Sequence, residues 1–296
     1  MGVLWAVAER DPTVKAQVER ELPGVLLLED EQDVCRSDVE AVVIATPAST
    51  HARIAKEVLL ARKHVLVEKP FTLTVADAEE VIAVAREVKR LVMVGHILLY
   101  QPAILWLRDY LNSGSLGTVS SLYQERLSLG TVREVENALW SLGVHDVAAL
   151  LFLLGQEPAH TATWGQEITQ TNVEDDMHLH MQFRGGIMAH IHNSWLWPET
   201  RRRLTIVGSR GMIEYDEATQ VVTLHKRRVL EDLGVLDEGS EVLFHGDPDP
   251  LGLELSHFLE CVQTGKSPRS SGESAVAVIR VLSQADRQIH ELRLAT

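Results

Sequence analysis

Several features that define other protein classes are scarce in this 296-residue sequence. There are only two cysteines, Cys35 and Cys261, far apart and without a CxxC partner, which excludes a disulfide framework and fits a reducing cytoplasm. The longest apolar runs, such as 39–45 and 150–154, are far too short to cross a bilayer, and the N-terminus has no signal-peptide pattern. We therefore expect a cytoplasmic protein without a membrane partner.

Positive charge is also in short supply. Lysine and arginine total 28 against 42 acidic residues, so the net charge of −14 opposes non-specific binding to nucleic acid. Hydrophobic residues make up 45% and charged residues 24%, a globular balance that excludes disorder. The length exceeds the usual size of one hydrophobic core, so we expect two domains.

Strand and helix patterns alternate over the first 96 residues. Short apolar runs predict buried strands at 3–8, 25–28, 39–45, 64–67 and 91–94. Helical periodicity between these runs, as over 50–62 and 75–89, indicates βαβ units. The pattern predicts an α/β domain with a doubly wound, Rossmann-type parallel sheet over residues 1–96.

After residue 96 the pattern changes to period two. Alternation between 158 and 225, interrupted by turns such as Gly185-Gly186, predicts a large and mostly antiparallel sheet. Helices are expected around 102–112, 144–154, 251–264 and 273–291. Residues 97–296 are therefore expected to form an α+β domain that binds substrate and mediates oligomerisation.

The first predicted strand is followed by an acidic residue, Glu9. In dinucleotide-binding folds such an acid hydrogen-bonds the ribose hydroxyls, and the next residue, Arg10, could pair with a 2′-phosphate. A preceding strand and a Gly-x-Gly-x-x-Gly turn are expected about 20 residues before that acid, but only Met1 and Gly2 precede strand 3–8. We expect a sheet without this first strand and turn, with a gap or a new pairing between strands 3–8 and 39–45.

Two further strands end in polar motifs, and ligands of open α/β sheets bind beyond such strand ends. Strand 39–45 ends in a Thr-Pro-x-x-x-His motif that is expected to face a cofactor, with Ser49 or Thr50 capping the next helix. Strand 64–67 ends in Glu68-Lys69-Pro70. Lys69 could bind a substrate hydroxyl and stabilise a developing alkoxide; the alternatives are an ordinary turn and a surface ion pair.

A helix that begins around residue 144 carries His145 in its first turn. The N-terminus of a helix lowers the pKa of an imidazole, and a neutral imidazole can act as a general base. The alternative is a histidine that caps the helix or packs in the core.

The order Thr-Pro-x-x-x-His, Glu-Lys-Pro, Gly-His with a following Pro-Ala, Leu-Gly and Gly-x-His-Asp resembles the glucose–fructose oxidoreductase / inositol dehydrogenase / rhizopine-catabolism (Gfo/Idh/MocA) family. Segment 126–141 is most similar to oxidoreductases of nucleotide-linked amino sugars. The resemblance implies an NAD(P)-binding domain, catalytic Lys69 and catalytic His145. Ser141 stands where many members have an aspartate. Expected cofactor contacts are Glu9, Arg10, Thr46, Pro47, Ser49, His51, Glu68 and Lys69, and expected substrate contacts are Lys69, Arg126, Arg133, Asn137, Trp140 and His145.

These observations predict an NAD-dependent oxidoreductase that oxidises a secondary hydroxyl, at C3, of a sugar or nucleotide-linked amino sugar. NAD is favoured over NADP because Glu9 would repel a 2′-phosphate. The alternative is an inactive relative without the phosphate-binding turn, which binds a sugar or joins a mixed oligomer.

One face of the predicted antiparallel sheet is polar and rich in histidine. A homo-oligomer, a dimer or tetramer, is expected through this face, because long strands of mixed polarity need water or a partner on the uncovered side. The four histidines could also hold zinc, but the favoured interpretation has no metal. The face is expected to carry His178, His180, Gln182, His190, His192 and Ser194.

Overall fold

The computed structural model describes residues 2–246 and 249–295 and divides into two compact units. The first unit runs to Gly95 and also includes Gly252–Ile279, and the second comprises the remaining residues. The sequence places the same boundary near residue 96 but assigns all later residues to the second domain. Gly252–Ile279 groups with the first unit because Val94 donates its amide to the Ser270 carbonyl at 2.9 Å, next to an antiparallel bridge between Met93 and Ser271.

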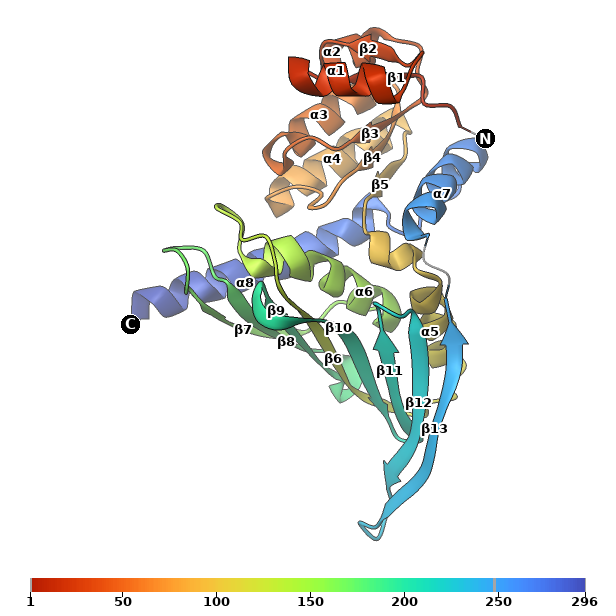
Figure 1. Ribbon diagram of the computed structural model, residues 1–296, viewed down its shortest axis with the longest axis vertical. Coiled ribbons are helices and arrows are strands. Elements are labelled where there is room, and N and C mark those ends of the chain that lie inside the picture. Colours follow the sequence, from red (N-terminus) through yellow and green to blue (C-terminus); the bar gives the residue numbers. More distant parts are fainter. Residues whose placement is uncertain (1, 247–248, 296) are drawn as a thin grey trace. The chain divides into compact units, whose positions relative to one another are not determined.

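The first unit alternates short parallel strands with helices, as predicted (Figure 1). The predicted cap of helix α3 was wrong. Neither Ser49 nor Thr50 caps this helix, because it already begins at Ala48, after Pro47. The Thr50 hydroxyl instead donates to the Pro47 carbonyl at 2.7 Å. The elements are β1 (Ala6–Ala8), α1 (Pro12–Glu21), β2 (Leu26–Leu28), α2 (Glu31–Arg36), β3 (Ala41–Ile44), α3 (Ala48–Leu60), β4 (His64–Val67), α4 (Val75–Val88), β5 (Val92–Val94) and α7 (Pro250–Thr264).

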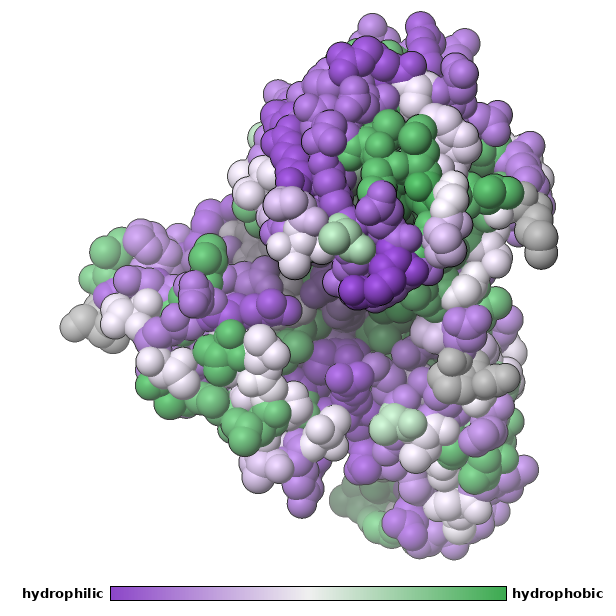
Figure 2. All heavy atoms as spheres, turned by 45° about the horizontal axis from the view of Figure 1, so that its top comes forward, coloured by the Kyte–Doolittle hydropathy of each residue, from purple (hydrophilic) through white to green (hydrophobic). Residues whose placement is uncertain are grey.

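The strands of the first unit form two separate sheets. One contains β1 and β2 and the other β3, β4 and β5, and every pair is parallel. Within the described residues no strand joins β1 to β3, which is the gap expected from the sequence. Val65 and Val67 on the central strand β4 are fully buried, whereas Val43 on β3 is 50% exposed. Figure 2 shows an apolar area among polar side chains on this unit, whose exposed apolar side chains include Trp5, Leu26 and Val43.

The second unit is built on one eight-stranded sheet in the order β13-β12-β11-β10-β6-β9-β8-β7. All pairs are antiparallel except β6–β9, which confirms a mostly antiparallel sheet. The strands are β6 (Val119–Leu129), β7 (His160–Gln166), β8 (Asp176–Gln182), β9 (Met188–Ser194), β10 (Leu196–Gly208), β11 (Gly211–Asp216), β12 (Val221–Val229) and β13 (Val235–His245), and the helical elements are η1 (Ile97–Tyr100), α5 (Pro102–Asn112), η2 (Leu139–Gly143), α6 (Val144–Leu154), η3 (Arg184–Gly186) and α8 (Gly272–Ala295).

The two faces of this sheet differ in polarity, as the sequence predicts. Helices α5, α6 and the second half of α8 lie along one face (Figure 1). Met177, Leu179 and Met181 on β8 are fully buried on that side, whereas His178 and His180 lie on the other, which we call the open face. Within the described residues, no helix combines the length and apolarity that a membrane span requires.

Candidate active site

Glu9 follows β1, at the end of the strand where an adenosine ribose would be recognised. Its Oε1 accepts hydrogen bonds from the amides of Arg10 and Asp11 at 2.7 and 2.9 Å, which fixes the carboxylate over the turn that starts α1. The Arg10 guanidinium pairs with Glu31 at 2.8 Å and lies 3.9 Å from Asp30. The positive charge of Arg10 is therefore already offset within this unit.

The Thr46-Pro47 loop after β3 is held by a buried histidine. Thr46 and Ser49 are exposed, while His51 is only 1% exposed. The Nε2 of His51 lies 2.7 Å from the Thr46 carbonyl and its Nδ1 lies 2.8 Å from the Pro70 carbonyl. His51 thus ties this loop to the Glu68-Lys69-Pro70 loop. Direct contact of His51 with a cofactor stays a prediction, since both ring nitrogens already face carbonyl oxygens.

The Glu68-Lys69-Pro70 loop extends β4. The Glu68 amide donates to the Ile44 carbonyl at 2.9 Å, which continues the β3–β4 pairing by one residue. A Cβ at Gly95 would lie 2.9 Å from the Glu68 Oε2, so a glycine after β5 leaves the room that this carboxylate occupies. Lys69 follows, half-buried, at the strand end. The glycine after β5 and the end of β4 thus hold Glu68 and Lys69 together at one edge of the sheet.

Glu254 on α7 is a buried acid that the sequence analysis does not predict. Its side chain is 1% exposed, and Oε1 has no hydrogen-bond partner among the described residues. Burial, with the nearby negative charge of Glu68 adding to it, raises the pKa of Glu254 to about 8. The raised pKa favours the protonated form of Glu254 at pH 7, which adds little negative charge beside Glu68.

In the second unit, His145 stands in the first turn of α6, directly after the π-helical turn η2. Its neighbour Asp146 is fully buried. The Asp146 Oδ1 accepts from the Arg126 Nε at 2.9 Å, and its Oδ2 accepts from the Asn193 Nδ2 at 2.7 Å. Arg126 also donates to both oxygens of Glu217, at 3.2 and 2.7 Å. This network fixes the turn that carries His145.

Arg126 is 7% exposed, and its donors point at two carboxylates. Burial opposes its charge, but Asp146 and Glu217 outweigh burial and raise the pKa of the guanidinium. The geometry supports a positioning role for Arg126, and a direct contact with substrate stays a prediction. No feature of the sequence pointed to Glu217 as a partner of Arg126 or to Asn193 as a partner of Asp146, because both lie far along the chain.

The other predicted substrate residues precede His145. The indole of Trp140 donates to Asp286 on α8 at 2.7 Å, and the Asn137 amide donates to Glu174 at 3.1 Å and to Asp286 at 3.3 Å. These bonds hold η2 against α8. Arg133, by contrast, lies on a loop with its side chain 51% exposed and pairs with Glu136 at 3.5 Å. The structure thus groups Asn137, Trp140 and His145 on one continuous segment.

Comparisons with known proteins give matches to both parts of the chain. Residues 3–96 match the family described as "Oxidoreductase family, NAD-binding Rossmann fold", and residues 104–214 match the GFO/IDH/MocA C-terminal domain. UDP-N-acetylglucosamine 3-dehydrogenase of Acidithiobacillus ferrooxidans is 29% identical over 286 residues, which cover 96% of this chain and 87% of that enzyme. A crystal form of that enzyme aligns with a TM-score of 0.84 at 26% identity, over 96% of this chain and 89% of that chain.

Two further relatives extend the comparison. The dTDP-3,4-didehydro-2,6-dideoxy-alpha-D-glucose 3-reductase of Saccharopolyspora spinosa is 27% identical, over 95% of this chain and 89% of that protein. The crystal structure of a putative oxidoreductase from Magnetospirillum magnetotacticum is 31% identical with a TM-score of 0.83, over 95% of this chain and 91% of that one. Both domain models match in order, and the Magnetospirillum protein is 31% identical over 95% of this chain. The chain therefore belongs to the GFO/IDH/MocA family of oxidoreductases.

Proposed function

We propose that the chain is an NAD-dependent dehydrogenase that oxidises the C3 hydroxyl of a nucleotide-linked amino sugar. The observation that carries the proposal is the position of Lys69 just after β4, in a chain similar over 96% of its length to a UDP-N-acetylglucosamine 3-dehydrogenase. The next residue, Pro70, is joined by its carbonyl through His51 to the Thr46-Pro47 loop. The name of the Saccharopolyspora relative also places its chemistry at carbon 3 of a nucleotide-linked sugar.

In this proposal Lys69 and His145 both act on the substrate hydroxyl. One side chain takes the proton and the other hydrogen-bonds the oxygen as negative charge develops on it. Bound nicotinamide supplies the hydride acceptor. Arg126, through Asp146, holds the first turn of α6 so that the His145 ring keeps its direction.

Replacing Lys69 tests the catalytic assignment. In an assay with NAD+ and UDP-N-acetylglucosamine, Lys69→Met should lower kcat by about 10²–10⁴-fold, because it removes the proton-transfer group or its partner. Lys56→Met is the matched control: it deletes a partly exposed lysine of the same unit, paired with the exposed Glu80, and should retain its rate. A Lys69→Met enzyme with the wild-type rate on its substrate would refute the assignment.

We also propose a preference for NAD over NADP. The ion pair of Arg10 with Glu31 supports it, since a guanidinium that is already paired attracts a 2′-phosphate less strongly. NADH should therefore bind more tightly than NADPH in fluorescence titrations, and Glu31→Gln should narrow the difference by releasing Arg10. Tighter NADPH binding by the wild type would contradict Glu9 as the ribose ligand.

A homo-oligomer formed through the open face stays a proposal as well. It is supported by the absence of a covering helix on that face among the described residues, and light scattering that finds only monomer at micromolar concentration would exclude it.

One observation favours a second candidate function, a sugar-binding relative without dehydrogenase activity. The sheets β1–β2 and β3–β4–β5 are separate within the described residues, whereas dinucleotide folds bind their cofactor at the strand ends of one continuous sheet. A chain that binds UDP-N-acetylglucosamine but gives no fluorescence change with NADH would support this candidate. Micromolar NADH binding would exclude it.

A further inference from the structure

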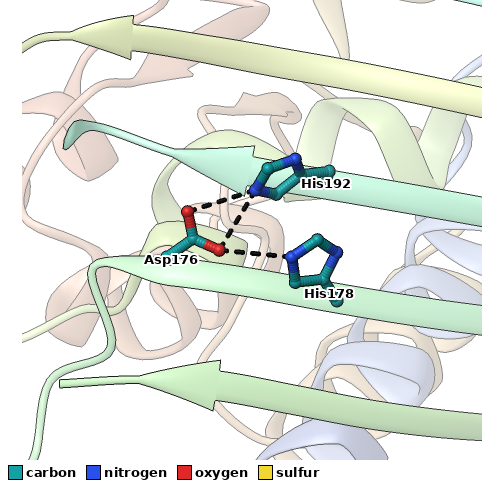
Figure 3. Close-up of side chains that lie close together, drawn as sticks. All are labelled: Asp176, His178 and His192. Atoms are coloured by element: carbon teal, nitrogen blue, oxygen red, sulfur yellow. Dashed lines mark hydrogen bonds and ion pairs between the residues drawn. The ribbon is translucent and has the colours of Figure 1, made fainter. Parts of the chain in front are cut away.

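Three side chains gather on the open face in a group that the proposed function does not use. Asp176 begins β8, His178 follows two residues later, and His192 on β9 lies directly opposite His178 (Figure 3). Residues two apart in a strand project from the same face of a sheet, and directly opposed residues on neighbouring strands lie side by side. Strand register therefore brings two imidazoles and one carboxylate together.

The distances suit a metal ion. The His192 Nε2 lies 3.1 Å from both Asp176 oxygens, the His178 Nε2 lies 3.4 Å from Oδ1, and one ligand atom from each residue lies within 4.8 Å of the others. Tetrahedral zinc, with bonds of about 2.0–2.2 Å, separates its ligand atoms by roughly 3.3–3.5 Å. The two separations between histidine and aspartate are already near this value.

The histidine pair needs a small adjustment. The two rings are stacked with centroids 4.0 Å apart, so their Nε2 atoms must tilt toward one another to share an ion. His178 can tilt because 47% of its side chain is exposed, whereas the side chains of His192 and Asp176 are less than one-fifth exposed and provide a fixed base.

We propose that Asp176, His178 and His192 form a binding site for a divalent transition-metal ion, with Zn²⁺ as the best fit. Imidazole nitrogens favour zinc, cobalt, nickel and copper, whereas magnesium and calcium prefer ligand sets made of oxygen. Three protein ligands leave one coordination position for water or a further ligand, on the side of His178, whose side chain is 47% exposed in the single chain. An ion bound here ties β8 to β9. From the four histidines alone, the favoured interpretation was a face without a metal. The structure adds the carboxylate of Asp176 to His178 and His192, and this third ligand favours a metal site.

The neighbouring histidine pair offers a built-in control. His180 and His190 are also directly opposed on β8 and β9, with their Nδ1 atoms 2.6 Å apart. Two ligands on one ion are at least about 3 Å apart at bond lengths near 2.1 Å, so this separation is that of a hydrogen bond. Tyr123 stacks on His190, and the Trp164 ring packs edge-on against His180. His180 and His190 are therefore two imidazoles joined by a hydrogen bond. Among the described residues, this pair has no carboxylate in the place that Asp176 takes beside His192.

The experiment is a calorimetric titration of the whole chain with ZnCl₂, after removal of any affinity tag and of bound metal with EDTA. The wild type should take up one equivalent. His192→Asn and Asp176→Asn should each weaken binding by at least about tenfold, since loss of a direct ligand costs at least as much as loss of a supporting residue. The control, His190→Asn, should bind as the wild type does. Circular dichroism checks that each variant is folded.

Cobalt provides an independent measurement. Co²⁺ should give the visible absorption of a tetrahedral site in the wild type and in His190→Asn, but not in His192→Asn. Zinc should also raise the Tm of the wild type and leave that of His192→Asn unchanged, because only a native-state site stabilises by mass action. Absence of stoichiometric uptake, or equal losses in His190→Asn and His192→Asn, would overturn the proposal. None of these measurements depends on dehydrogenase activity.

Discussion

The two units build their sheets from different strands. In the first unit the strands have three or four residues and divide into a pair and a triplet, whereas in the second unit strands of six to thirteen residues form one continuous sheet. In the second unit, all strands between the two edge strands β13 and β7 are paired on both sides. In the first unit, β1 and β3 each have an edge that no described strand covers. The second unit therefore supplies its own backbone pairing, and the first leaves part of its pairing open.

The units also differ in where they keep their charges. Arg126, Asp146 and Glu217 form a buried network in the second unit. In the first unit most ion pairs have an exposed partner, as Arg10 is in its pair with Glu31. The buried Lys63 donates to the backbone carbonyls of Ser37 and Val39, and burial raises the pKa of Glu254 to about 8. Since a buried charge is costly without its partner, the second unit depends more on each member of its network.

The largest expected effect is in hydrogen exchange, which tests the difference in strand pairing between the two units. Amides of β1 and β3 on the edges away from β2 and β4 should exchange nearly as fast as in a free peptide. Amides of β6 and β9, which are paired on both sides, should be slower by about 10⁴-fold or more, since core strands open only with global unfolding. Residue-resolved NMR measures this difference. Strong protection of the outer edge of β3 would mean that another segment covers it.

The sequence predicts the elements well where apolar side chains mark a buried face. Alternation on β8 placed Met177 and Leu179 in the core and His178 outside, because a strand with one buried face must have period two. Strand β13 was not predicted, because it carries the charged run Asp237-Glu238-Gly239-Ser240-Glu241 and no apolar alternation. Its pairing with β12 is marked by charge instead: Lys226, Arg227 and Arg228 meet Glu241, Asp237 and Glu238 at 2.6, 3.0 and 3.1 Å.

The residues of the candidate site could be predicted from local motifs, but their partners from distant parts of the chain could not. Lys69 and His145 follow local signals, a strand end and a helix start, so their motifs locate them. Arg126 also occurs in a recognisable segment, yet its partner Glu217 is 91 residues away, and only the register of β6, β10 and β11 brings the two together. Partners fixed by tertiary packing leave no mark at short spacing.

The next largest effect is expected in the stability of the second unit when the buried network of Arg126, Asp146 and Glu217 is broken. Arg126→Met should destabilise the second unit by about 3–5 kcal/mol, because it leaves Asp146 fully buried without its cation and leaves Glu217 only the more exposed Arg202, 3.6 Å away. Urea unfolding followed by tryptophan fluorescence measures the change. The matched control is Arg10→Met, which breaks an ion pair whose arginine is 67% exposed and should leave the urea midpoint unchanged. Equal shifts for the two variants would remove the distinction between buried and surface pairs.

The smallest expected effect concerns the buried acid of the first unit. The pKa of Glu254 is raised to about 8 in the folded chain from an ordinary value of 4.5, first by burial and then by Glu68. A raised pKa in the folded state means that the stability it contributes is fully present below the unfolded pKa and is lost as pH rises through 8. Glu254→Gln removes this titration. Relative to the wild type, the variant should gain about 1–3 kcal/mol of stability between about pH 5 and about pH 9.

Thermal unfolding of both proteins across this pH range measures the gain. The control is Glu260→Gln on the same helix, whose side chain is 54% exposed and pairs with Lys266 at 3.3 Å. Because exposed ion pairs contribute little to stability, Glu260→Gln should unfold as the wild type does. If Glu254→Gln also tracked the wild type at every pH, Glu254 would be ionised in the folded chain. The first unit would then hold a buried carboxylate without a cation beside it, and the contrast with the network around Arg126 would fail.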